Sequence, residues 1–451
     1  MIGDSQMKQN TLSNRKIFLG AQEIAGMMER LNNAFHDMGI ESDYYCLYQY
    51  KFALGTEEKK DSAILRKYRK YTDKIGQTTN KYIEEWWHFL QMGSVLHLFF
   101  HALFKYDFFI YIFGHGMFYF NKHLSRIEEL EFFILKLFHK KMVMWLCGSD
   151  SRPPYCNGAI YFRKVERLHL EVQKRYERIR MLEKYMTLVD VPGSAHFHTK
   201  PYLIHNCIGI PVDAKEKVCV HKADKDKVTI LHAPSNQKSK GTEIIRNILK
   251  EIREEGYEFE YIEVSGLPHD VVLEKMAMSD IVIDQLYSDT PMAGFATEAS
   301  INGVPVVVGG YYAEVYKKVL PQPIAPTVYC SPEEMKEKII YLIEHKEERD
   351  RIGKEEQEYI ENNCLATVVA DKFLKIFDGS YPKEWVMDPA DNDYIWGCGT
   401  NKELVTHEIV RLVDAYGPDS LCLDKNGILY QKYMQLYHEA KSEKEGLREE
   451  R

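Results

Sequence analysis

The sequence lacks the features that mark several classes of protein. Its nine cysteines are odd in number and scattered, and no two have the two-residue spacing of a zinc or redox motif. We therefore expect reduced thiols rather than a disulfide framework. The net charge of −8 at pH 7 argues against a general nucleic-acid binder, which normally carries a basic excess. No internal repeat or low-complexity segment is present.

A long uninterrupted apolar run is also missing. The most apolar stretch, residues 86–113, is interrupted by histidine, glutamine, lysine and aspartate side chains, so it is a poor membrane span. A buried, aromatic-rich helix followed by a strand is the better prediction. The first sixteen residues are polar and lack the apolar core of a signal peptide, so we expect a cytoplasmic location.

What is present is a chain of 451 residues, long enough for two or three domains. In its second half, apolar strands alternate with helices, and the strands are continuously apolar. This pattern indicates a parallel sheet covered on both faces. The predicted strands are 228–232, 259–264, 280–286 and 305–308. The predicted helices are 242–255, 269–278, 295–302, 332–345, 349–362 and 366–377.

The N-terminal half repeats this alternation more loosely. The predicted strands are 16–19, 107–113, 142–146 and 187–191, and the predicted helices are 23–38, 128–139 and 163–184. We therefore predict an α/β fold with two doubly wound Rossmann-like domains, at 14–208 and 213–378, facing across a cleft. A linker is expected near 206–215, and a C-terminal helical extension at 382–451. Open α/β sheets bind ligands at the carboxyl ends of their strands.

The first candidate site follows the first strand of the second domain. Ser235, Lys240 and Gly241 lie in the segment Ser-Asn-Gln-Lys-Ser-Lys-Gly-Thr, which leads into a helix. A helix N-terminus offers unpaired amides and partial positive charge, which suit a diphosphate. An exposed loop whose lysines face water explains the pattern equally well.

The second candidate site is the segment that contains Phe295 and Glu298, at the start of a short helix. A carboxylate at the cleft edge can accept two hydroxyl protons at once, which is the geometry of a ribose diol. The alternative is an acid at a helix N-terminus that merely favours the helix dipole.

Three further candidates lie in the N-terminal half. Gly20 and Gly26 flank a strand-to-helix turn, where they permit close approach of backbone to phosphate or serve as ordinary turn residues. Asp150 and Arg152, in a Gly-Ser-Asp-Ser-Arg loop, could hold sugar hydroxyls or phosphate, or form a capping turn with a local ion pair. His115 ends another strand, where it could reach the cleft or be structural.

A run of alternating basic and aromatic residues, centred on Tyr68, occupies residues 66–71. It could contact a lipid surface or an anionic acceptor. A solvated helix face is the competing interpretation.

Together these motifs resemble the group 1 (family 4) glycosyltransferases of the GT-B fold. The resemblance covers most of residues 14–377 and is strongest over 228–308. The matching segments are LHAPSN at 231–236, KGT at 240–242, PH at 268–269, DIVIDQL at 280–286, FATEA at 295–299, GVPV at 303–306, EIAG at 23–26 and GSDSR at 148–152.

The resemblance implies an enzyme that takes a sugar from a nucleotide-sugar donor, usually with retention of configuration and without a bound metal or cofactor. Glu298 would bind the ribose, Lys240 the diphosphate, and Gly26 would let backbone amides approach the phosphates. The full donor-binding set is Gly26, Arg152, Ser235, Lys240, Gly241, Phe295 and Glu298, and the catalytic candidates are His115, Asp150 and Lys240. The acceptor would be a glycan, a lipid-linked molecule or another compound in surface-polysaccharide biosynthesis. Contact with the inner face of a membrane would follow for a lipid-linked acceptor.

Two positions depart from the family pattern. Thr290, with Asp289 beside it, stands where the family often has a second glutamate, and Cys147 stands where relatives tend to have a histidine. Two alternatives therefore stay open beside the transferase. One is a catalytically silent GT-B protein that binds a nucleotide sugar or assists a partner enzyme, and the other is a nucleotide-sugar epimerase.

Overall fold

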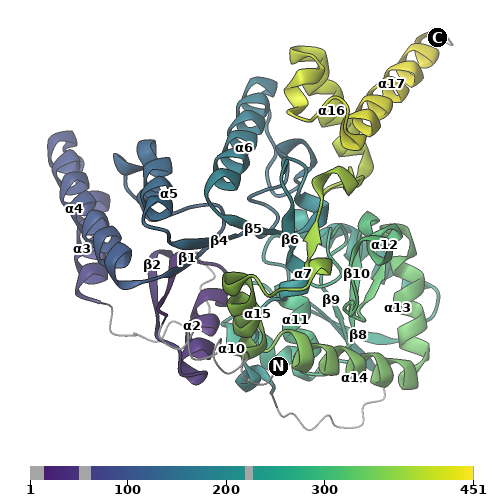
Figure 1. The fold of residues 1–451 in the computed structure, drawn as a ribbon. Helices are drawn as coiled ribbons and strands as arrows, with labels where there is room; N and C mark the ends of the chain where they lie inside the picture. The colour runs from purple at the N-terminus through teal and green to yellow at the C-terminus, as the bar shows by residue number, and fades with distance from the viewer. Residues whose placement is uncertain (1–14, 50–61, 219–226, 450–451) are drawn as a thin grey trace. The chain divides into compact units, whose positions relative to one another are not determined.

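The computed structural model describes residues 15–49, 62–218 and 227–449, which form two compact α/β units (Figure 1). Unit 1 comprises the chain up to Leu146 together with Met181–Val189 and Ala366–Tyr381. Unit 2 comprises Cys147–Arg180, Asp190–Leu365 and Pro382–Arg451. Each unit is thus assembled from three separate segments of the chain. The boundaries of the two Rossmann-like domains, 14–208 and 213–378, stay a prediction.

Unit 1 is built on parallel strands in the order β2-β1-β3-β4-β5. The strands are β1 (Ile17–Glu23), β2 (Ser42–Gln49), β3 (Phe108–Ile112), β4 (Lys141–Trp145) and β5 (Thr187–Asp190). The helices of this part of the chain are α2 (Met27–Asp37), α3 (Ala63–Gln77), α4 (Lys81–Lys105), α5 (Glu128–Leu137), the end of α6 (Val165–Tyr185) and α15 (Ala366–Asp378). All five side chains of β3 are buried, as expected for a strand covered on both faces.

Unit 2 contains a five-stranded parallel sheet in the order β11-β10-β9-β7-β8. The strands are β7 (Val228–His232), β8 (Phe259–Glu263), β9 (Ile281–Ile283), β10 (Val306–Gly309) and β11 (Val328–Cys330). Around it lie α7 (His205–Ile208), α8 (Gln237–Lys240), α9 (Thr242–Glu254), α10 (His269–Ala277), α11 (Gly294–Ile301), α12 (Tyr316–Val319), α13 (Met335–Glu344) and α14 (Lys346–Asn363).

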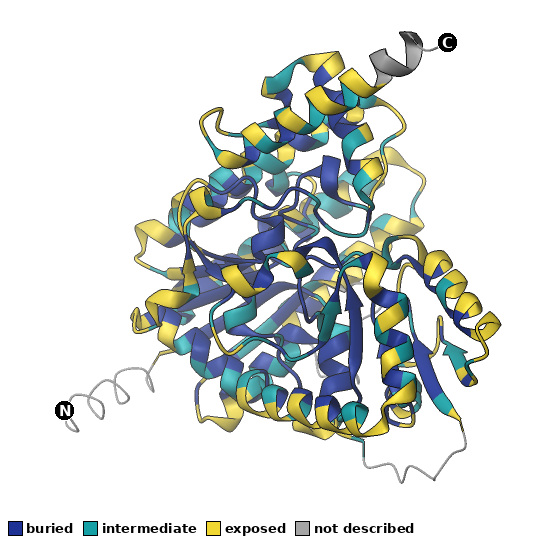
Figure 2. Ribbon diagram, turned by 90° about the vertical axis from the view of Figure 1, so that its right-hand side faces the viewer, coloured by how far each residue is buried: buried dark blue, intermediate teal, exposed yellow. Residues whose placement is uncertain are grey.

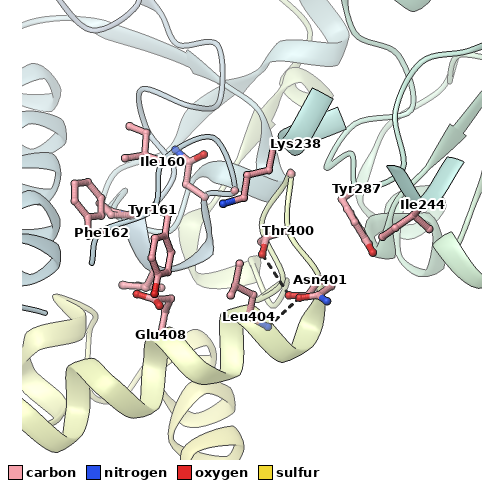
Figure 3. A pocket seen from close by; sticks show the side chains of 15 residues that line it. Ile160, Tyr161, Phe162, Lys238, Ile244, Tyr287, Thr400, Asn401, Leu404 and Glu408 are labelled. Atoms are coloured by element: carbon pink, nitrogen blue, oxygen red, sulfur yellow. Dashed lines mark hydrogen bonds between the residues drawn. The ribbon is translucent and has the colours of Figure 1, made fainter. Parts of the chain in front are cut away.

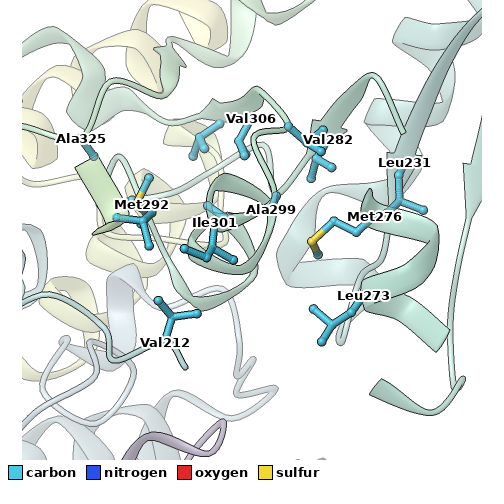
Figure 4. Packing of buried hydrophobic residues seen from close by; sticks show 14 of the residues in the cluster. Val212, Leu231, Leu273, Met276, Val282, Met292, Ala299, Ile301, Val306 and Ala325 are labelled. Atoms are coloured by element: carbon cyan, nitrogen blue, oxygen red, sulfur yellow. The ribbon is translucent and has the colours of Figure 1, made fainter. Parts of the chain in front are cut away.

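Successive side chains of the unit 2 strands pack into different cores, because strand side chains alternate between the two faces of a sheet. Ile230 contributes to a core with α9 and α13, whereas Leu231 contributes to a core with α10 and α11. Figure 4 shows the second of these cores, and Figure 2 shows the buried sheet with exposed residues on the outer sides of its helices. The doubly wound α/β fold predicted from the sequence is therefore confirmed.

The C-terminal residues belong to unit 2. β12 (Val386–Met387) pairs antiparallel with β6 (Tyr202–Ile204), and α16 (Lys402–Tyr416) and α17 (Ile428–Glu449) follow. Arg411 on α16 donates to the carbonyl of Phe162 at 3.0 Å, and the Tyr433 hydroxyl on α17 donates to the carbonyl of Ile395 at 2.7 Å. The helical extension predicted at 382–451 is thus integrated into unit 2.

Several elements differ from the sequence prediction. β1 runs on to Glu23, so the helix expected from residue 23 begins at Met27. β9 is shorter than expected because the amide of Leu286 bonds to the carbonyl of Lys240 as the chain turns away from the sheet. β11 was not predicted from the sequence.

Residues 86–113 form most of α4 and then β3, so the helix and strand are as predicted, but α4 is not a buried helix. Tyr82, Trp86 and Phe104 are 88%, 57% and 74% exposed. Within the described ranges, no helix combines the length and apolar character needed to cross a membrane.

Candidate functional site

The strand order of unit 2 defines where its sheet can bind a ligand. From β7 the chain crosses to β8 on one side, and from β9 it crosses to β10 on the other. The carboxyl ends of β7 and β9 therefore form the switch point, where open α/β sheets bind ligands in a crevice. His232 is the last residue of β7, and Asp284 directly follows β9.

His232 fixes the turn that leads from β7 to α9. Its Nδ1 lies 2.8 Å from the carbonyl of Ile283, and its Nε2 lies 2.9 Å from Oγ1 of Thr242. Because burial lowers the pKa of His232, the ring is neutral at pH 7. A carbonyl only accepts, so Nδ1 donates to it and Nε2 accepts from the threonine hydroxyl. The first residue of α9 is thereby anchored between the two strands of the switch point.

Lys240 lies at this switch point. It is the last residue of α8, and its Nζ forms an ion pair of 2.6 Å with Oδ1 of the buried Asp284. The lysine side chain is 17% exposed, and Oδ2 of Asp284 has no hydrogen-bond partner. This ion pair holds the lysine ammonium at the edge of the sheet, where the sequence predicted a diphosphate-binding group. Ser235, at the start of the same turn, is exposed.

Gly241 separates α8 from α9 in a conformation that favours glycine, with φ at +72°. A Cβ at this position would lie 2.7 Å from Cβ of Leu286, so the residue is also constrained sterically. Glycine has no side chain to cap a helix, and no side-chain cap bond closes the start of α9. The first amides of α9 are therefore suited to an anionic ligand.

Glu298 lies in the second turn of α11 and is buried. The first turn of that helix contains no acidic residue, so the interpretation of Glu298 as an N-terminal acid that favours the helix dipole is wrong. Its Oε1 instead accepts a hydrogen bond of 3.0 Å from Nε2 of His269, the first residue of α10. Phe295, one turn earlier, is half-buried and packs against the core.

Lys240 and Glu298 both lie toward the carboxyl edge of the unit 2 sheet, because α9, α10 and α11 begin there. The helix α9, which follows Lys240, packs on one face of the sheet, and α11, which contains Glu298, packs on the other. Each has its own partner, Asp284 for the lysine and His269 for the glutamate. Their convergence on one nucleotide stays a prediction.

Unit 1 has the same strand order, and its switch point lies between β1 and β3. Gly26 precedes α2 with φ at +74°, as Gly241 precedes α9. Here, however, the carboxylate of Glu23 accepts from the amides of Met28 at 3.3 Å and Glu29 at 3.1 Å. The amide of Met27 donates to the carbonyl of Ile24. The amides that Gly26 was predicted to present to phosphate are therefore bonded within the chain.

Glu23 is buried, and burial raises its pKa to about 7, although hydrogen bonds oppose the shift. Gly20 does not belong to the turn, because it lies inside β1. A Cβ on Gly20 would be 2.7 Å from the carbonyl of Tyr45 on the neighbouring strand. Its role is close packing of two strands, and the expectation that it flanks the turn is wrong.

His115 follows β3 in unit 1. Its ring stacks on Tyr119 with centroids 3.4 Å apart, and its Nδ1 lies 3.6 Å from Oε1 of Glu128. That carboxylate also accepts from the amide of Gly116 at 2.9 Å. The histidine is thus held by local contacts at the carboxyl edge of the unit 1 sheet.

The loop after β4 is a turn in which the amides of Ser151 and Arg152 donate to the carbonyl of Gly148, and Asp150 neither caps a helix nor forms the local ion pair considered from the sequence. Asp150 accepts from the amide of Cys147 at 2.8 Å, and burial raises its pKa to about 7. Arg152 pairs with Asp289 instead of Asp150, through its Nε at 3.1 Å and through Nη2. Its Nη2 also donates to Ser194 at 2.8 Å.

The two departures from the family pattern have defined contacts. Asp289 is the buried partner of Arg152, and Thr290 accepts from Nδ2 of Asn206 at 2.9 Å. Cys147 lies partly exposed beside the Asp150 turn. The positive charge of Arg152 is therefore already balanced by Asp289, which precedes Thr290 in the sequence.

A cavity of about 170 Å³ in unit 2 was not predicted from the sequence (Figure 3). Its lining includes Tyr161, Lys238 and Leu404, and the ammonium of Lys238 lies 5.4 Å from the Tyr161 ring. The wall is completed by residues 399–401, where the amide of Gly399 donates to the carbonyl of Tyr287 at 2.7 Å. Neither Lys240 nor Glu298 lines this cavity. The sequence feature that could have indicated this wall is Gly-Cys-Gly at 397–399. Both glycines have positive φ in the structure.

In the part of the chain that the structure describes, no group of three or more histidine, cysteine, aspartate or glutamate residues is arranged to hold a metal ion.

Neither a protein-family model nor the sequence of a curated protein matches the chain. Among solved structures, sucrose-phosphate synthase from Thermosynechococcus elongatus is similar over 81% of this chain and 99% of its own, with 12% identity and a TM-score of 0.49. HepE from Anabaena in complex with UDP-glucose is similar over 81% and 100%, with 11% identity and a TM-score of 0.46. A candidate UDP-N-acetylglucosamine 2-epimerase from Listeria monocytogenes is similar over 82% and 98%, with 13% identity and a TM-score of 0.41. Similarity at this level does not identify an activity.

Proposed function

We propose that the chain is a glycosyltransferase that moves a sugar from a nucleotide-sugar donor to a glycan, lipid-linked or other acceptor. The proposal rests chiefly on Lys240, which its ion pair with Asp284 holds at the switch point beside the uncapped start of α9. A lysine and free helix amides at the carboxyl edge of a doubly wound sheet suit a diphosphate. The motif resemblance of residues 228–308 to group 1 glycosyltransferases supports the same assignment.

Glu298 supplies the ribose contact in this proposal. Its Oε1 is oriented by His269, and a carboxylate that is already fixed in place binds a diol with less loss of conformational freedom. The base and the sugar of the donor are left open.

The proposed chemistry is transfer with retention of configuration, without a metal or cofactor. The bond from the sugar C1 to the diphosphate oxygen breaks, and a bond from C1 to the acceptor oxygen forms on the same face. The acceptor proton passes to an oxygen of the departing diphosphate. Lys240 stabilises the charge that develops on that diphosphate, and the protein acts through positioning and electrostatics.

A second candidate is a protein of the same fold that binds a nucleotide sugar without transferring it. Two observations favour it. The Nε and Nη2 of Arg152 donate to Asp289 and Ser194, and the amides at the start of α2 donate to Glu23. A substrate would have to displace these protein contacts before Arg152 or the amides of α2 could bind the donor.

Incubation of the pure protein with UDP-, GDP- and dTDP-sugars separates these functions. Slow release of nucleoside diphosphate supports transfer, because water then replaces the acceptor. Binding without release under any acceptor indicates the silent protein. A changed sugar on an intact nucleotide indicates an epimerase and contradicts the proposal.

The role of Glu298 is tested with Glu298→Gln, which keeps the size of the side chain. We expect nucleoside diphosphate to bind about 10- to 100-fold more weakly, since a charge-assisted hydrogen bond contributes about 1.5–3 kcal/mol. Calorimetry with the 2′-deoxy nucleotide provides the control. The wild type should lose affinity for the deoxy form, and the variant should lose much less, because its amide oxygen makes only a neutral hydrogen bond. A variant that discriminates between the two forms as strongly as the wild type would exclude Glu298 as the ribose contact.

A further inference from the structure

One face of α4 is exposed along the helix and carries five aromatic side chains, with Gly93 and His97 between them. The outward residues recur at intervals of three and four, so they form a single stripe on a helix with 3.6 residues per turn. They are Tyr82, Trp86, Phe89, Gly93, His97, Phe100 and Phe104. The five aromatic members are between 50% and 88% exposed. From Tyr82 to Phe104 this aromatic stripe is about 33 Å long.

α5 extends the aromatic stripe. Leu130, Phe133 and Leu137 recur at the same intervals and are between 44% and 62% exposed. The ring of Phe104 on α4 meets that of Phe138, the residue that directly follows α5, edge to face with centroids 6.3 Å apart. The two apolar faces therefore join. Soluble proteins rarely expose so large a contiguous apolar surface unless it binds something.

The helix beside this surface is strongly basic. α3 packs against α4 through stacking of Tyr71 on Trp87, with centroids 6.0 Å apart. It contains five basic residues and one acidic residue, in a chain whose net charge is −8. Lys67, Lys70 and Lys74 are exposed and share one face of the helix. Positive charge is thus concentrated next to the aromatic stripe.

Tyr68 does not contribute to this surface. It is buried, and its hydroxyl donates to the carbonyl of Phe120 at 2.9 Å. The basic-aromatic run at 66–71 therefore divides between a buried tyrosine and exposed lysines, which the alternation of residue types in the sequence did not reveal.

We propose that the aromatic stripe of α4 and α5, together with the lysines of α3, binds the surface of a membrane that contains anionic phospholipids. Amphipathic helices with aromatic residues on one face lie in the plane of the lipid interface, where Trp and Tyr are favoured. Neighbouring lysines are attracted to anionic headgroups. This combination of aromatic rings and local positive charge favours a bilayer over a protein partner. The inference stands on unit 1 alone and does not depend on the proposed transferase.

Flotation of the full chain with vesicles tests the proposal. We expect binding to vesicles of phosphatidylcholine mixed with phosphatidylglycerol and much weaker binding to phosphatidylcholine alone. Lys67→Gln/Lys70→Gln/Lys74→Gln should lower partitioning on the order of 100-fold. Trp86→Ser/Phe104→Ser should lower it roughly tenfold per aromatic residue.

Matched controls lie in unit 2. Lys250→Gln/Lys318→Gln/Lys354→Gln removes three exposed lysines, and Tyr341→Ser removes an exposed aromatic residue. Both should bind vesicles like the wild type. Circular dichroism and nucleotide binding should be unchanged in every variant, which separates failure of this proposal from failure of the proposed function.

Two results would overturn the proposal. One is vesicle binding that is absent, or that neither set of variants weakens. The other is a wild-type dimer in light scattering that Trp86→Ser/Phe104→Ser converts to a monomer while neither protein floats with vesicles. A second copy of the chain would then cover the aromatic stripe.

Discussion

In unit 1 the turn after β1 is closed by a carboxylate of the protein, whereas in unit 2 the turn after β7 carries a lysine and leads into an uncapped helix. Both turns end in a glycine with positive φ, Gly26 and Gly241, and the five parallel strands of unit 1 follow the same order as those of the unit 2 sheet. The fold therefore provides a switch point in each unit. The side chains decide which one can receive an anion, since Glu23 bonds to the helix amides of the first, whereas the helix of the second starts without a side-chain cap beside Lys240.

The largest expected effect comes from removing the lysine that distinguishes the two turns. We expect Lys240→Ala to lower turnover by about 10²- to 10³-fold, because a positioned charge at the leaving group is lost. Donor hydrolysis and transfer rates provide the measurement. Lys238→Ala, two residues earlier in the same turn, is the matched control and should change turnover only slightly.

Lys240→Ala also leaves Asp284 buried without its partner, which destabilises the fold by about 3–5 kcal/mol. The double variant Lys240→Ala/Asp284→Asn should recover stability in urea unfolding without recovering turnover. If activity returned with stability, the role of Lys240 would be structural.

The two glycines give a second comparison. Gly26→Ala should cost about 1 kcal/mol, because a Cβ there meets only Arg30 at 3.5 Å and the cost is that of the left-handed backbone. Gly241→Ala should cost about 3 kcal/mol, because its Cβ would also collide with Leu286. Urea unfolding of both variants measures the difference. Equal costs would show that the turn after β7 can adjust around Leu286.

The smallest effect concerns the pH dependence of stability. Burial raises the pKa of Glu23 from 4.5 to about 7, so the folded state prefers its protonated form. Its contribution to stability is complete below pH 4.5 and is lost as the pH rises through 7. Glu23→Gln should remove this loss, so that its stability falls less between pH 5 and 8, by on the order of 2 kcal/mol.

Urea unfolding at both pH values provides the test, and Glu243→Gln in the exposed first turn of α9 is the control. The control should follow the wild type, because other buried acids titrate identically in both. A Glu23→Gln variant with the wild-type pH profile would show that this carboxyl is not the source of the effect.

Hydrophobic pattern predicted the sheets better than the turns between them. Continuous apolar runs such as 228–232 and 306–308 have one stable arrangement, which is a strand covered on both faces. The capping role of Glu23 was missed because a glutamate ahead of a glycine is also typical of a helix start. Glu23 reaches the amides of α2 only because β1 continues to residue 23, beyond the predicted end at residue 19. The local sequence does not specify this length.

The site was predicted in part. Lys240 and Gly241 were correctly placed in a strand-to-helix turn because such a turn has a recognisable composition, and their binding roles stay a prediction. The contacts of Asp284, His232 and His269 with Lys240, Thr242 and Glu298 were not predicted. Those pairings join residues between 10 and 44 positions apart, so only the folded sheet reveals them. α4 was misjudged for a different reason. A helix that is apolar nearly all round is typically buried, but part of its surface faces solvent here.

The placement of residues 397–399 governs when the protein can finish folding during synthesis. The amide of Gly399 bonds to Tyr287, and the amide of Cys398 bonds to Cys156, so late residues complete a wall that begins more than two hundred residues earlier. A ribosome delivers the chain from its N-terminus. The cavity around Tyr161 therefore stays unfinished until α16 has emerged, and a nascent chain paused before that point displays an incomplete second unit to chaperones and proteases.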